Sequence, residues 1–100
     1  MNIDVEKMMK RLRYKLKNQT ISDQELLYFV KEGLEIAPKL QIYEEKNILR
    51  LILLQFLFSH AQLETRLIRE TLLKTLTYSA WDEDKRLDFI YKNLINRQPS

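Results

Sequence analysis

The middle of the chain is apolar on every side. When residues 47–59 are placed on a helix at about 100° per residue, hydrophobic side chains point in all directions; they are Ile48, Leu49, Leu51, Ile52, Leu53, Leu54, Phe56, Leu57 and Phe58. Because a helix that is hydrophobic all round must be covered all round, this stretch predicts a central helix over about residues 38–59. We expect other helices, from the same chain or from a second copy, to enclose it.

The segments before this stretch predict two amphipathic helices. Over residues 4–18, the apolar positions fall within an arc of about 100°; they are Val5, Met8, Met9, Leu12 and Leu16. Ser22 and Glu25 then form a capping box at the start of a second helix, with its buried stripe at Leu26, Leu27, Val30 and Leu34. The residue before Pro38 disfavours helical geometry, so we expect this helix to end near Ile36.

The segment after Pro38 contains neither glycine nor proline as far as Thr77. One helix of about 40 residues would be about 60 Å long, which is too long for a compact domain of this size. We therefore expect a break near Ser59 and His60; an unbroken helix would instead indicate an extended oligomer. Beyond that break the apolar residues form two stripes, one of Ile68, Leu72, Leu73 and Leu76 and the other of Leu63 and Leu67.

These segments predict an all-α fold, a compact bundle of four to five helices forming a single domain over residues 1–100. A final helix follows residues 79–84 and buries Leu87, Ile90, Tyr91, Leu94 and Ile95. One glycine and two prolines provide little of the turn chemistry that a β-sandwich or barrel needs. The central apolar run is shorter than the roughly 20 residues of a membrane span, so we expect no membrane insertion.

The composition favours a cytoplasmic protein. The chain has no cysteine, which excludes disulfides, thiolate metal sites and cysteine nucleophiles. Its first residues lack the apolar segment of a secretory signal.

Positive charge is concentrated in the first helix. The formal net charge is +3, and residues 1–17 hold six cations and two anions. A one-sided cationic surface attracts phosphate or acidic protein, so the candidate anion or nucleic-acid contacts are Lys10, Arg11, Arg13, Tyr14 and Lys17. The alternative is a solvated surface with Tyr14 lying along the lysine side chains.

Catalytic and metal-binding patterns are missing from the sequence. The one histidine, His60, has Leu57 three residues before it, so the Glu-x-x-His motif of di-metal bundles is absent. Asp82, Glu83 and Asp84 suit the positive end of a helix dipole and lack the glycine of a calcium loop. We expect no catalytic residue, no cofactor and no metal site, and hence no enzyme.

Apolar residues outside the main stripes suggest contact with another molecule. A large apolar side chain off the buried stripe has either a second helical neighbour or a partner; the candidates are Tyr28, Phe29, Leu63, Leu67 and Phe89. Because a chain of this size leaves much of its surface wet, we expect a homodimer and a non-enzymatic protein–protein interaction or regulatory module that also binds an unidentified protein. The alternative is a nucleic-acid-associated protein that uses its basic first helix for phosphate contacts.

Overall fold

The structure, a computed structural model, describes residues 3–17, 19–60 and 66–95, with side chains for residues 3–17, 19–57 and 70–93. Its elements are α1 (Val5–Lys15), α2 (Asp23–Ile36), the 3-10 helix η1 (Ala37–Leu40), α3 (Glu45–His60), α4 (Arg66–Leu76), α5 (Glu83–Ile90) and the π-helical turn η2 (Tyr91–Ile95). The expected all-α class is confirmed, since the described residues contain helices and no strand. None of the described helices is long and apolar enough to cross a membrane.

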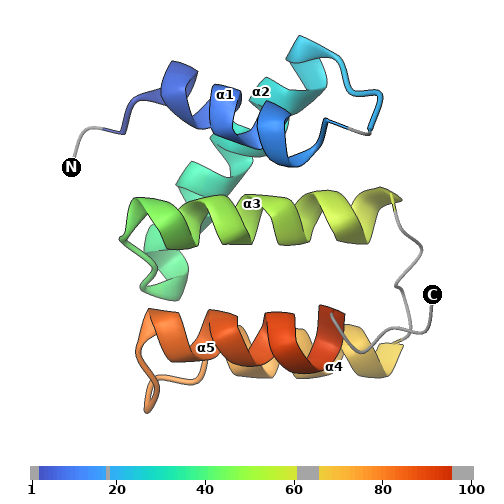
Figure 1. Ribbon diagram of the computed structural model, residues 1–100. Coiled ribbons are helices and arrows are strands. Elements are labelled where there is room, and N and C mark those ends of the chain that lie inside the picture. Colours follow the sequence, from blue (N-terminus) through green and yellow to red (C-terminus); the bar gives the residue numbers. More distant parts are fainter. Residues whose placement is uncertain (1–2, 18, 61–65, 96–100) are drawn as a thin grey trace.

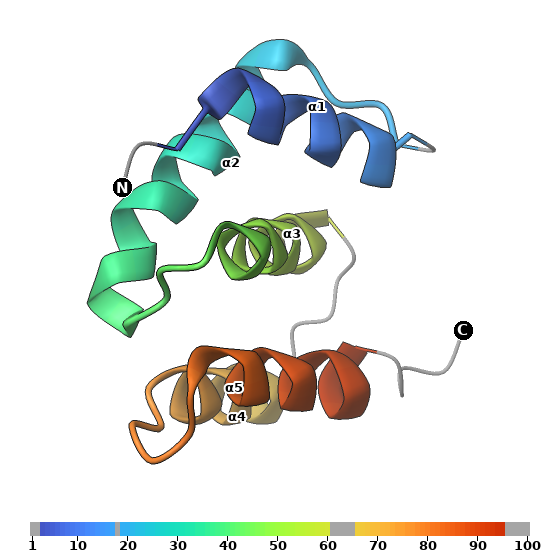
Figure 2. The same cartoon turned by 60° about the vertical axis from the view of Figure 1, so that its left-hand side comes forward.

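The helices form three layers (Figure 1). In this view α1 lies above α3, α2 runs from the level of α1 down behind α3, and α4 and α5 lie below it. Figure 2 shows the same order after rotation, with α4 and α5 side by side. The radius of gyration is 13.3 Å, close to the value of about 13 Å for a compact chain of this length.

The central helix is enclosed by the protein's own helices. Six apolar side chains of α3 are between 1% and 5% exposed; they are Ile48, Leu49, Leu51, Ile52, Leu54 and Phe56. They join one core with Met8 and Leu12 of α1 and with Leu87 and Ile90 of α5. The expected bundle around a hydrophobic helix is therefore confirmed, and this chain covers the described part of α3 except along Leu53 and Leu57, which are half-buried.

The central helix begins at Glu45, later than the predicted start near Pro38. Residues 37–40 form one 3-10 turn, which ends at Gln41 with the left-handed backbone angles φ 56° and ψ 45°. The N–H of Ile42 donates to the carbonyl of Ala37 at 2.9 Å, which closes the turn. The chain therefore changes direction before α3 begins.

The expected break of the long apolar run is confirmed. The helix α3 ends at His60 and α4 begins at Arg66, so residues 38–77 do not form one rod. The second helix also agrees with the sequence, because it ends at Ile36 and the Ser22 hydroxyl accepts the N–H of Glu25 at 3.1 Å.

A close crossing of α2 and α3 is centred on Gly33. A Cβ atom added at Gly33 would lie 2.4 Å from Cγ1 of Ile52, which is too close for two carbon atoms. The absence of a side chain at Gly33 therefore lets α2 and α3 approach each other.

Candidate functional site

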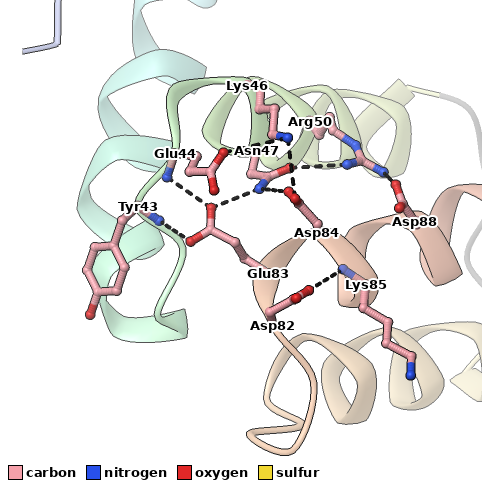
Figure 3. A network of polar contacts seen from close by, with 10 residues as sticks. All are labelled: Tyr43, Glu44, Lys46, Asn47, Arg50, Asp82, Glu83, Asp84, Lys85 and Asp88. Carbon is pink, nitrogen blue, oxygen red and sulfur yellow. Dashed lines mark hydrogen bonds and ion pairs between the residues drawn. The ribbon is translucent and has the colours of Figure 1, made fainter.

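A polar network joins the start of α3 to the start of α5 (Figure 3). Its centre is Asn47, which is 0% exposed. The Asn47 amide nitrogen donates to Oε1 of Glu83 at 2.8 Å and to Oδ1 of Asp84 at 2.7 Å. The Asn47 amide oxygen accepts from Nη1 of Arg50 at 3.1 Å. All the hydrogen-bonding groups of this buried side chain are therefore used.

The Glu83 carboxylate caps α3 from a different helix. Its two oxygens accept the backbone N–H groups of Tyr43 at 3.0 Å and Glu44 at 2.9 Å. Tyr43 and Glu44 directly precede α3, so their N–H groups have no partner within that helix, and Glu83 supplies one from α5. Burial opposes ionisation of Glu83, but the hydrogen bonds from Asn47, Glu44 and Tyr43 outweigh it and lower the pKa of the Glu83 carboxyl.

The other two acids of this cluster also have structural partners. Asp82 is the N-cap of α5 and accepts the N–H of Lys85 at 2.8 Å. Asp84 accepts from Asn47 and from Nζ of Lys46 at 3.3 Å, and these bonds lower the pKa of the Asp84 carboxyl against the effect of burial. The predicted helix-start role is thus correct for Asp82, whereas Glu83 and Asp84 also hold α3.

Two arginines extend the network. Nη2 of Arg50 lies 2.5 Å from Oδ1 of Asp88, and the Tyr91 hydroxyl donates to the Arg50 carbonyl at 2.7 Å. Burial raises the pKa of that hydroxyl. Arg86 is only 4% exposed and donates to the carbonyls of Leu40, Leu76 and Gln41 at 2.6, 2.5 and 3.0 Å. These hydrogen bonds connect α5 to the C-terminal ends of η1 and α4.

A cavity of about 660 Å³ lies beside this network. Its lining residues are Gln41, Tyr43, Glu44, Ser79, Ala80, Trp81, Asp82, Glu83, Asp84 and Arg86. The carboxylates of Asp82 and Glu83 already accept backbone N–H groups at helix starts, and that of Asp84 accepts from the side chains of Asn47 and Lys46. Among the described residues, no group of three or more His, Cys, Asp or Glu side chains could hold a metal ion. The charged side chains here stabilise the fold.

An apolar groove of about 330 Å³ separates η1 and α3 from α4. It is lined by Ile36, Leu40, Leu51, Leu54, Gln55, Leu72, Leu73 and Leu76. Leu73 belongs to the apolar stripe of Ile68, Leu72 and Leu76 that the sequence indicated, yet its side chain is 54% exposed. Within the described part of the chain, Oε1 of Gln55 is buried and has no hydrogen-bond partner.

A second groove, of about 410 Å³, lies between α1 and α3. Its lining residues are Lys7, Lys10, Arg11, Tyr14, Lys15 and Leu49. Three of the predicted anion contacts, Lys10, Arg11 and Tyr14, therefore come together. Lys17 adjoins them, with its Nζ 5.2 Å from the centre of the Tyr14 ring.

The remaining predicted anion contact, Arg13, does not line this groove. Its guanidinium donates to the carbonyl of Ile21 at 2.9 Å and pairs with Asp23. Lys7 and Lys15 line the groove instead, although the sequence had not singled them out. Their spacing from Lys10, Arg11 and Tyr14 is that of one helix face, and this signal could have identified them.

The predicted partner contacts have different surroundings. Tyr28 is 61% exposed. Phe29 is buried and its ring packs edge-on against Phe56, with the ring centres 5.7 Å apart, so its second neighbour is a helix of the same chain. Phe89 is half-buried beside Trp81, with the ring centres 5.5 Å apart. Leu63 and the side chain of Leu67 lie outside the described residues.

Comparisons of this chain with protein-family models, with curated proteins and with solved structures find no match. The function therefore has to be inferred from the geometry of these surfaces.

Proposed function

We propose that this chain is a non-enzymatic protein–protein interaction module that forms a homodimer through the apolar groove between η1, α3 and α4. The observation that supports this proposal best is the position of Leu73. This side chain is 54% exposed and lies on the rim of the groove, whose other lining residues are apolar apart from Gln55. A half-exposed leucine beside an apolar groove is a candidate contact for a second molecule.

Two-fold symmetry favours a second copy of this chain as the molecule that fills the apolar groove. In a two-fold interface, the same surface patch contacts itself on the partner. Such a patch has to be complementary to itself. Leu73, which is 54% exposed, and the groove of about 330 Å³ that it lines are the two features on which the proposal depends.

The support for a dimer differs from what the sequence suggested. In the sequence, the excess of apolar residues in the central helix was the reason to expect a second chain. Because the described part of α3 is covered within one chain except along Leu53 and Leu57, the proposal rests on Leu73 and the groove. The additional protein partner and the cytoplasmic location stay predictions from the sequence.

The dimer is expected to be weak. Full burial of an exposed leucine side chain contributes about 1.5–3 kcal/mol. Because Leu73 is 54% exposed before association, its two copies together contribute about 1.6–3.2 kcal/mol. Association costs about 4–15 kcal/mol in lost translational and rotational freedom. Contacts flanking Leu73 must supply the difference, so the dimer should be sought at high micromolar protein concentrations.

Light scattering over a range of concentrations tests the proposal. The wild type should approach the mass of two chains, and Leu73→Lys should remain a monomer with unchanged helical circular dichroism, because Leu73 is exposed. Tyr28→Ser, which removes an exposed ring from α2, is the matched control and should dimerise normally. A wild type that stays monomeric at high micromolar concentration contradicts the proposal. Loss of the dimer in Tyr28→Ser alone would place the interface on α2.

The alternative function, association with nucleic acid, has support on a different element. The lysines of α1 line a groove in the opposite layer of the molecule.

A further inference from the structure

We propose that the groove between α1 and α3 binds single-stranded nucleic acid, with a base stacked on Tyr14 and phosphates held by the surrounding lysines. The proposal is independent of the dimer, because it uses other residues and another layer of the molecule.

Four lysines around this groove are available to an anion. Arg11 is paired with Glu45, with Nη1 and Oε1 3.3 Å apart, and Arg13 is paired with Asp23. Within the described part of the chain, no carboxylate lies within ion-pair distance of the lysines of α1 and its C-terminal turn, which are Lys7, Lys10, Lys15 and Lys17. A cluster of cations on one helix side raises the local positive potential and attracts phosphate.

The exposed tyrosine points to a single strand. Tyr14 is 73% exposed among these cations, more than the other exposed tyrosines, which are Tyr28 at 61%, Tyr43 at 52% and Tyr78 at 49%. Proteins that bind single strands combine a positively charged groove with aromatic side chains on which bases stack. In a duplex the base faces are already stacked on one another, so Tyr14 would add little to duplex binding.

The packing of α1 argues against a lipid surface as the ligand. A helix that lies on a membrane inserts its apolar side. In α1 that side is used by the core, where Met8 and Leu12 are 0% exposed and Leu16 is 9% exposed. The side of α1 that remains accessible is cationic and carries one aromatic ring.

The site is short. From Lys7 to Lys15 the helix rises about 12 Å at 1.5 Å per residue, enough for only a few nucleotides. Each phosphate neutralised on a single strand contributes about −0.7 to the slope of log K against log salt. Four lysines thus predict a slope of about −3.

Fluorescence anisotropy with a labelled oligothymidylate tests the proposal, and the matching duplex serves as the comparison. At about 50 mM salt the wild type should bind the single strand more tightly than the duplex. Tyr14→Ala should weaken binding of the single strand about tenfold or more, as expected for loss of one stacked base. Tyr14→Phe should bind within about twofold of the wild type, because stacking needs the ring and not the hydroxyl.

A matched pair of lysine variants separates this groove from general charge. Lys7→Ala/Lys10→Ala should weaken binding and reduce the salt slope by about 1.4. Lys31→Ala/Lys39→Ala removes the same charge from exposed positions of α2 and η1 and should leave binding unchanged. Circular dichroism of each variant checks that the fold is intact.

Several results would overturn the proposal. The first is that the wild type does not bind the single strand at about 50 mM salt. The second is that Tyr14→Ala binds as tightly as the wild type, and the third is that both double lysine variants lose the same amount of affinity. Equally tight, Tyr14-dependent binding of polyglutamate or of anionic vesicles would also overturn it, since neither ligand has a base to stack.

Discussion

At the scale of single residues, Asn47 is the position where the fold depends most on one polar side chain. It is fully buried and donates to two carboxylates. Asn47→Ala should destabilise the protein by about 2–4 kcal/mol, because hydrogen bonds to charged groups are lost and their acceptors stay partly buried. Urea unfolding followed by circular dichroism measures this as a lower midpoint at an unchanged slope.

Asn93→Ala is the control for this substitution. The Asn93 amide makes one bond, to the carbonyl of Phe89 at 3.0 Å, so its loss should cost about 1 kcal/mol or less. Equal effects of the two changes would mean that Asn47 is no more important than any partly buried asparagine.

Individual residues were the hardest features to predict from the sequence. Arg86 lies one helical turn before Ile90, close to the buried stripe, but nothing in the sequence indicates that the carbonyls of Leu40, Gln41 and Leu76 would be there to accept from it. Leu73 fits an apolar stripe of its helix, which indicated a packing partner, yet its side chain is 54% exposed and lines the apolar groove. Both outcomes depend on how helices distant in sequence pack together, which periodicity does not encode.

At the scale of elements, the start of α3 is held by a carboxylate from α5. The pKa of the Glu83 carboxyl is lowered in the folded protein, so the unfolded chain binds a proton more readily than the folded one. Stability from this contact is therefore present above the ordinary pKa of a glutamate and is lost as the pH falls through the lowered value.

Glu83→Gln tests this contribution. In the wild type the free energy of unfolding should decrease on acidification below about pH 4.5, a trend shared with Asp84. Glu83→Gln should be less stable at neutral pH and should show a smaller decrease, since the group that titrates is gone. Glu35→Gln, at an exposed position of α2, should retain the full pH dependence. If the free energy of unfolding of Glu83→Gln depends on pH as that of the wild type does, titration of the Glu83 carboxyl does not contribute to stability.

Most elements could be predicted because their signals are local. The capping box at Ser22 and Glu25 gave the start of α2. Its end at Ile36 was also predicted, but the reason was wrong, because Ala37 before Pro38 keeps the helical angles φ −52° and ψ −48° and the chain continues into η1. The all-round apolar pattern identified α3 as central. Its start was missed because the turn is made by Gln41 in a left-handed conformation, for which glycine or asparagine is the usual sequence signal.

At the scale of the whole molecule, the two grooves lie in different layers. The basic groove belongs to α1 and α3, and the apolar groove to η1, α3 and α4. In Figure 1 the layers of α1 and α4 lie on opposite sides of α3. A dimer formed through α4 would therefore leave both basic grooves accessible.

Two accessible grooves predict avidity for long strands. A strand that reaches both grooves gains effective concentration for the second contact, so the wild type should prefer a long oligothymidylate to a short one. Leu73→Lys, which blocks the proposed dimer, should bind the short strand normally and lose the preference for the long one. Anisotropy titrations with both lengths measure this, and a preference that survives in Leu73→Lys would separate nucleic-acid binding from dimerisation.

The contacts of Glu83 and Arg86 have a consequence for the order of biosynthesis. Both residues bind backbone groups about forty positions earlier in the chain. While the protein is being translated from its first residue, the beginning of α3 is made well before the side chains that hold it. A nascent chain that has not yet reached residue 86 lacks these contacts, so native packing of the start of the apolar central helix must wait until residue 86 has been made.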